Sequence, residues 1–170
     1  LDGMRDQVAR DRVLADLAGT FFEIGLRSAA RDANLVLAAT AQEQYTRWVA
    51  MINLLEIASI DRSELIFEQY RRELATSDLP ASLAAFYHFY VGQGYRMFER
   101  FDLARSSLER AVDIATRHQV NEVIFKAEQA LGEIRAGGAM VVEESREPSP
   151  AVSDVASAIR ELRTLAGVAG

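Results

Sequence analysis

Few side chains in this sequence could carry out metal or acid–base chemistry. There are two histidines, His88 and His118, and no cysteine. Neither histidine lies in a His-Glu-x-x-His or Glu-x-x-His pattern, so a zinc site would depend mostly on carboxylates. Glu122, Glu128 and Glu133 are spaced along one segment without forming a recognisable acid–base pair. We therefore expect no metal site and no catalytic residue, with His88 packed or hydrogen-bonded on a helix.

Motifs for phosphate binding and nucleophilic catalysis are also missing from the sequence. Gly92-Gln93-Gly94 lacks the third glycine of a dinucleotide-binding loop and does not follow a predicted strand. The chain contains no Gly-x-Ser-x-Gly sequence, which marks a hydrolase nucleophile. The sequence therefore predicts a protein that is not an enzyme and that binds no cofactor.

Composition narrows the classes of partner. The 170 residues carry a net charge of −6, with 49% apolar and 26% charged residues. An acidic chain without a basic stripe is a poor nucleic-acid binder. An apolar run of about 18 residues, which a membrane span needs, is missing. No signal peptide is visible, and we expect a cytoplasmic protein that binds neither nucleic acid nor membrane.

The elements that position these residues are predicted to be helices. Alanine, leucine, glutamate and arginine are abundant, and no segment alternates apolar and polar residues as a strand does. We expect a helix break with an N-cap near Asp32–Asn34. The predicted helices span about residues 4–29, 34–59, 61–75, 80–99, 101–118, 121–135 and 152–166.

Glycine and proline indicate a linker near the C-terminus. Gly137-Gly138 and the later Pro148 and Pro150 follow the last of the closely spaced helices. We predict a helical domain over 1–136, a flexible linker over 137–150 and an amphipathic helix over 151–170. The apolar stripe of that helix could fold back, pair with a second chain or bind a partner.

The most distinctive pattern spans two neighbouring helices. Gly92 and Ala104 would let the helices approach closely, while Tyr95 and Leu108 fill the space beside them. Ala111 leaves room for the next helix. The full pattern is H-x2-V-G-x2-Y, eight residues, then A-x3-L-x2-A, and it comprises His88, Val91, Gly92, Tyr95, Ala104, Leu108 and Ala111.

This pattern resembles one tetratricopeptide repeat, with His88 and Val91 in place of the usual tryptophan and leucine. The resemblance implies an all-α stack of antiparallel helix hairpins, an α-solenoid, although any antiparallel helix pair needs small residues at its crossing. A degenerate copy 41 residues earlier would place Ser63, Phe67 and Tyr70 at the positions of Ala104, Leu108 and Ala111. Longer units of this kind are similar to helical repeats of bacterial signalling and transcription regulators.

The resemblance also implies a function. Such repeats hold peptides in a concave groove lined by the first helix of each unit. Arg96 would grip a carboxylate of the partner or pair with Glu99, and the aromatic residues could instead belong to the core. The expected groove residues are Tyr45, Trp48, Phe86, Phe89, Gln93, Arg96 and Met97, with Ile52 and Leu55 beside them.

We therefore predict a protein- or peptide-binding module of a larger bacterial signalling or regulatory protein. A homodimerisation or scaffold domain is one alternative, because exposed helix faces could pair with a second copy. A helical sensor of small ligands is another, and it would need a closed pocket with converging polar groups.

Overall fold

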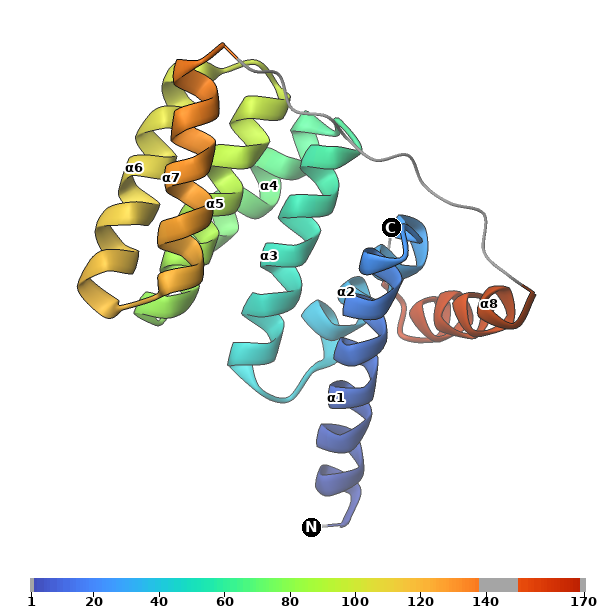
Figure 1. Ribbon diagram of the computed structural model, residues 1–170. Coiled ribbons are helices and arrows are strands. Elements are labelled where there is room, and N and C mark those ends of the chain that lie inside the picture. The colour runs from blue at the N-terminus through green and yellow to red at the C-terminus, as the bar shows by residue number, and fades with distance from the viewer. Residues whose placement is uncertain (1, 138–149, 169–170) are drawn as a thin grey trace. The chain divides into compact units, whose positions relative to one another are not determined.

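The computed structural model describes residues 2–137 and 150–168, and every regular element in these ranges is an α-helix (Figure 1). The predicted all-α fold class is confirmed. The expected linker over 137–150 lies outside the described residues, apart from Gly137 and Pro150. The helices are α1 (Asp2–Glu23), α2 (Arg27–Thr40), α3 (Gln44–Ile60), α4 (Glu64–Ala75), α5 (Ala81–Met97), α6 (Phe101–His118), α7 (Asn121–Arg135) and α8 (Pro150–Leu165).

The described residues form two compact units that divide between Leu54 and Leu55, within α3. The N-terminal unit contains α1, α2, the first part of α3 and α8. The C-terminal unit contains the last turns of α3 and helices α4 to α7. The boundary therefore lies inside the segment that the sequence predicts to be one domain.

The first predicted helix boundary is wrong. Instead of continuing to residue 29, α1 ends at Glu23, and Gly25 adopts a φ of 82°. The Leu26 N–H donates to the Phe21 carbonyl at 2.8 Å, which closes a glycine-dependent C-terminal turn. The expected N-cap at residues 32–34 is also wrong, because Asp32 and Asn34 are buried within α2.

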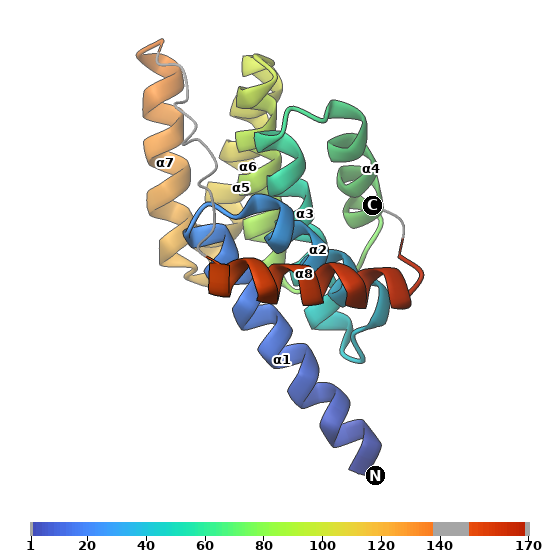
Figure 2. The same cartoon turned by 90° about the vertical axis from the view of Figure 1, so that its right-hand side faces the viewer.

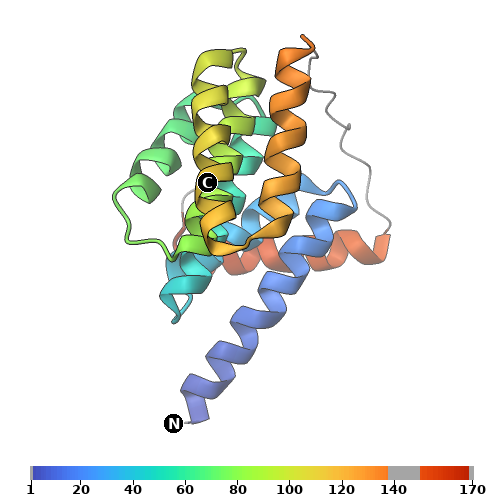
Figure 3. The same ribbon diagram turned by 60° about the vertical axis from the view of Figure 1, so that its left-hand side comes forward.

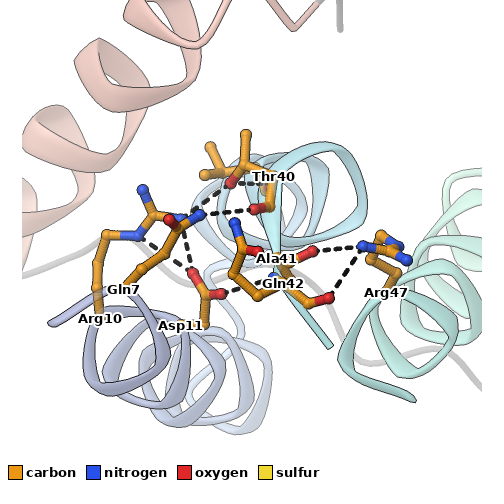
Figure 4. Close-up of polar contacts among 8 residues, drawn as sticks. Gln7, Arg10, Asp11, Thr40, Ala41, Gln42 and Arg47 are labelled. Atoms are coloured by element: carbon orange, nitrogen blue, oxygen red, sulfur yellow. Dashed lines mark hydrogen bonds and ion pairs between the residues drawn. The ribbon is translucent and has the colours of Figure 1, made fainter. Parts of the chain in front are cut away.

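A second break, which the sequence pattern does not predict, separates α2 from α3 at residues 41–43. Polar side chains satisfy the backbone there (Figure 4). The buried Asp11 carboxylate accepts the Gln42 N–H at 3.2 Å, and the Arg47 guanidinium donates to the Ala41 carbonyl at 2.6 Å. Gln7 donates to the Thr40 carbonyl at 3.1 Å. These bonds replace those that a continuous helix would make.

Helix α8 folds back within the N-terminal unit and packs against α2 (Figure 2). Ile159 is buried, and the Arg163 guanidinium donates to the Asp32 carboxylate at 2.8 Å. Arg160 lies 3.8 Å from the same carboxylate. Of the three alternatives for the terminal helix, folding back is the one that the structure contains. Asp32 forms ion pairs with this helix and does not act as a helix cap.

In the C-terminal unit, α5, α6 and α7 pack against one another (Figure 3). Leu108 and Ala111 of α6 are completely buried in their shared core, and Ala104 of the same helix is also completely buried. A Cβ atom on Gly92 would lie 2.6 Å from Cγ of Leu108 and 3.2 Å from the Ala104 carbonyl oxygen. The absence of a side chain at Gly92 is therefore what lets α5 approach α6.

A second close approach joins α4 to α5. A Cβ atom on Gly94 would lie 2.6 Å from Cζ of Phe67 on α4. The Phe67 ring is fully buried and meets the rings of Tyr95 and Phe98 edge-on, with centroid separations of 5.5 and 5.2 Å. The two glycines therefore allow α5 to approach two neighbouring helices. Gly92 permits the contact with α6, and Gly94 permits the contact with α4.

The turns after α3, α5 and α6 share one backbone geometry. Each contains a non-glycine residue at positive φ, namely Arg62 at 54°, Glu99 at 60° and Gln119 at 58°. The following N–H donates to the carbonyl five residues earlier, in the pairs Ser63–Ala58, Arg100–Tyr95 and Val120–Ala115. The N-cap positions of α6 and α7 belong to Arg100 and Val120.

Replacing Gln119 by glycine is expected to raise the free energy of unfolding by about 0.5–1 kcal/mol, because glycine adopts positive φ without steric cost. Urea denaturation measures the change. Glu109→Gly is the matched control, since Glu109 is exposed within α6 and should lose about 1 kcal/mol. Equal losses in both variants would contradict this interpretation of the turn.

Candidate functional site

Side chains of three helices in the C-terminal unit surround a groove of about 570 Å³. Helix α5 lies between α3 and α7 (Figures 1 and 2) and contributes five of the twelve lining residues, more than either neighbour. The groove is lined by Glu56, Ser59 and Ile60 of α3, by Phe89, Tyr90, Gln93, Arg96 and Met97 of α5, and by Lys126, Gln129, Ala130 and Glu133 of α7.

The lining residues recur at intervals of 37 residues. Glu56, Gln93 and Ala130 form one such set, and Ser59, Arg96 and Glu133 form another. The positive-φ residues Arg62 and Glu99 have the same separation. The three helices therefore contribute equivalent positions to one groove.

Arg96 and Glu133 form the best-defined polar contact in the groove. The Arg96 side chain is only 2% exposed, and its Nη2 donates to Glu133 Oε2 at 2.8 Å. Its Nη1 donates to Gln93 at 2.9 Å, while its buried Nε has no hydrogen-bond partner among the described residues. The hydrogen bond from Arg96, followed by one from Gln129, lowers the pKa of Glu133. Arg96 therefore pairs with Glu133, and not with Glu99 as one of the two expectations had it.

Glu56 has a different environment on the α3 side of the groove. Burial raises the pKa of its carboxyl to about 7, and the positive charge of Lys126 opposes that rise. Lys126 itself donates to Glu122 at 2.6 Å. Burial, followed by the charges of Glu56 and Glu122, raises the pKa of the Tyr90 hydroxyl. Glu56 is therefore a desolvated carboxyl beside an aromatic ring.

The structure brings together four of the seven residues that the sequence predicts for the groove, namely Phe89, Gln93, Arg96 and Met97. Phe89 also belongs to the buried core shared by α5, α6 and α7, whereas Phe86 packs against that core without lining the groove. Tyr45, which is 51% exposed, and Trp48 belong to the N-terminal part of α3. Ile52 and Leu55 are buried in the core rather than lining the groove.

The predicted repeat is too long by four residues, or about one helical turn, and it therefore does not lead to the lining residues of α3. The predicted period of 41 residues relates Gln93 to Ile52, whereas the observed spacing of 37 residues relates it to Glu56. On α7, the same spacing leads from Phe89 to Lys126 and from Arg96 to Glu133. Counting 37 residues from the α5 residues would have found lining positions on both neighbouring helices.

The two histidines lie outside the groove. His88 is partly buried, and its ring meets the Tyr87 ring edge-on with a centroid separation of 4.9 Å. Burial, with a smaller contribution from the Arg110 charge, lowers the pKa of His88. His118 is exposed at the end of α6. Among the described residues, His, Asp and Glu side chains form no cluster of three that could hold a metal ion.

The free energy of unfolding is expected to fall in wild type, relative to Glu56→Gln, as the pH rises from about 4.5 to about 7. The folded-state pKa of Glu56 is about 7 against an ordinary value of 4.5. In this range the folded protein binds more protons than the unfolded chain, so raising the pH favours unfolding. Urea denaturation of both proteins across this range measures the difference, and parallel curves would contradict the assignment.

None of the helices in residues 2–137 and 150–168 combines the length and the apolarity that crossing a membrane requires. We find no match between this chain and any protein-family model, curated protein or solved structure.

Proposed function

We propose that the C-terminal unit is a peptide-binding module that holds a segment of a partner protein in the groove of α3, α5 and α7. The observation that carries this proposal is the 37-residue recurrence of the lining positions. Stacked helix pairs that use equivalent positions create a continuous binding surface, as tetratricopeptide-like repeats do. We further propose that the module is similar to a tetratricopeptide-like repeat domain and that it belongs to a larger signalling or regulatory protein.

The chemistry of the lining fits a peptide segment. Tyr90 and Ile60 are partly exposed and offer apolar contact area, and aromatic residues are common anchors of protein interfaces. Gln93 and Gln129 offer hydrogen-bonding groups for a peptide backbone. The lining thus combines apolar anchors with polar groups that can orient a chain.

The test compares two tryptophan variants of α7. Gln129 lines the groove, whereas its exposed neighbour Glu128 does not. Fluorescein-labelled pools of acetylated, amidated heptapeptides serve as the probe, and fluorescence anisotropy measures binding. We expect Gln129→Trp to weaken binding at least about tenfold, a change of roughly 1.4 kcal/mol, and Glu128→Trp to leave it unchanged. Equal binding by both variants, or no binding by wild type, would refute the proposal.

A further inference from the structure

The Glu56 carboxylate is the charged group of the groove that lacks an internal partner. It is partly buried, and no described residue forms a hydrogen bond or an ion pair with it. A carboxylate removed from water without a counter-ion is energetically unfavourable. A cation supplied from outside the chain would relieve that cost.

The internal cations of the groove already hold other carboxylates. The Lys126 ammonium lies 2.6 Å from Glu122, and Arg96 lies 2.8 Å from Glu133. An acidic ligand would have to displace one of these pairs and would also meet Glu56. The charge arrangement therefore favours a basic ligand over an acidic one.

Aromatic side chains complete the surroundings of Glu56. Tyr90 lies near enough for the Glu56 charge to affect its hydroxyl, and its ring meets the Phe89 ring edge-on with a centroid separation of 5.1 Å. Aromatic faces attract ammonium and guanidinium groups. The methylene stem of a lysine or arginine side chain can also pack along such rings while its charge reaches a carboxylate.

We propose that the groove recognises a lysine or arginine side chain of the partner segment through the carboxylate of Glu56. This inference rests on the peptide-binding function proposed above and specifies the chemistry of its ligand. The basic group would lie between the Glu56 carboxylate and the ring of Tyr90, with the peptide backbone reaching the polar groups around Gln93 and Arg96.

The test uses three pools of acetylated, amidated heptapeptides that differ only at the central residue, which is lysine, norleucine or glutamate. We expect wild type to bind the lysine pool about tenfold more tightly than the norleucine pool. Glu56→Gln should abolish this ratio. Glu128→Gln is the matched control, because it makes the same charge change on α7 outside the groove and should preserve the ratio.

The pH dependence supplies a second measurement. The groups that face Glu56 are Tyr90 on α5 and Lys126, with its partner Glu122, on α7. We expect the lysine preference of wild type to increase from pH 6 to pH 8, as the Glu56 carboxyl ionises, and the Glu56→Gln ratio to stay flat. A preference that decreases over this range would indicate a protonated carboxyl donating to a carbonyl and would refute the cation site.

The remaining outcomes separate the two proposals. Equal binding of the three pools, combined with loss of binding in Gln129→Trp, would overturn the cation site and leave the peptide groove standing. A preference for the glutamate pool, or a lysine preference that survives in Glu56→Gln, would also overturn the cation site. Failure of every pool to bind wild type would overturn both proposals.

Discussion

Replacing Phe67 by alanine is expected to lower the free energy of unfolding of the C-terminal unit by about 3–5 kcal/mol. The ring is fully buried on α4, between Gly94 and the rings of Tyr95 and Phe98. Removing it eliminates both edge-on aromatic contacts and leaves a cavity that the short helix α4 cannot readily fill. Urea denaturation followed by circular dichroism measures the loss.

Leu65→Ala is the matched control for this prediction. Leu65 lies two residues before Phe67 on the same helix and is 85% exposed. Its truncation should change the free energy of unfolding by less than about 0.5 kcal/mol. A Phe67→Ala loss below about 1 kcal/mol would mean that α4 does not depend on this contact.

Replacing Gly94 by alanine is the second large expected effect. The new Cβ atom would lie 2.6 Å from Cζ of Phe67, well inside van der Waals contact. Either the ring leaves its rotamer or α4 moves away from α5, and overpacking of this kind costs about 1–3 kcal/mol. This loss should exceed the roughly 1 kcal/mol that alanine gains over glycine within a helix.

Gly132→Ala separates the packing effect from helix propensity. Gly132 lies within α7, and a Cβ atom there would meet nothing within 4 Å. This variant should gain up to about 1 kcal/mol in the same denaturation experiment. The two glycine-to-alanine substitutions are thus expected to have opposite signs. Stabilisation by both would show that α4 yields to the new methyl group without cost.

Some helix boundaries follow from the neighbouring sequence, whereas others depend on residues far away in the chain. The predicted bounds of α6 and α7, residues 101–118 and 121–135, agree with the structure. The break at residues 41–43 depends instead on Asp11 and Gln7, which lie about 30 residues earlier in the chain. Helix periodicity in the neighbouring sequence contains no information about such partners, so the pattern suggested one continuous helix.

The sequence by itself determined the all-α class and the small residues at which α5 meets α6. Tertiary structure decided the register between α3 and α5, and with it the groove. A shift of four residues turns a helix by little more than one full turn, so an apolar stripe looks nearly the same in either register. Only the positions of the turns at Arg62 and Glu99 distinguish a 37-residue spacing from a 41-residue one. The sequence alone therefore does not identify Glu56 as a groove residue. The tertiary structure places it in the same groove as Arg96.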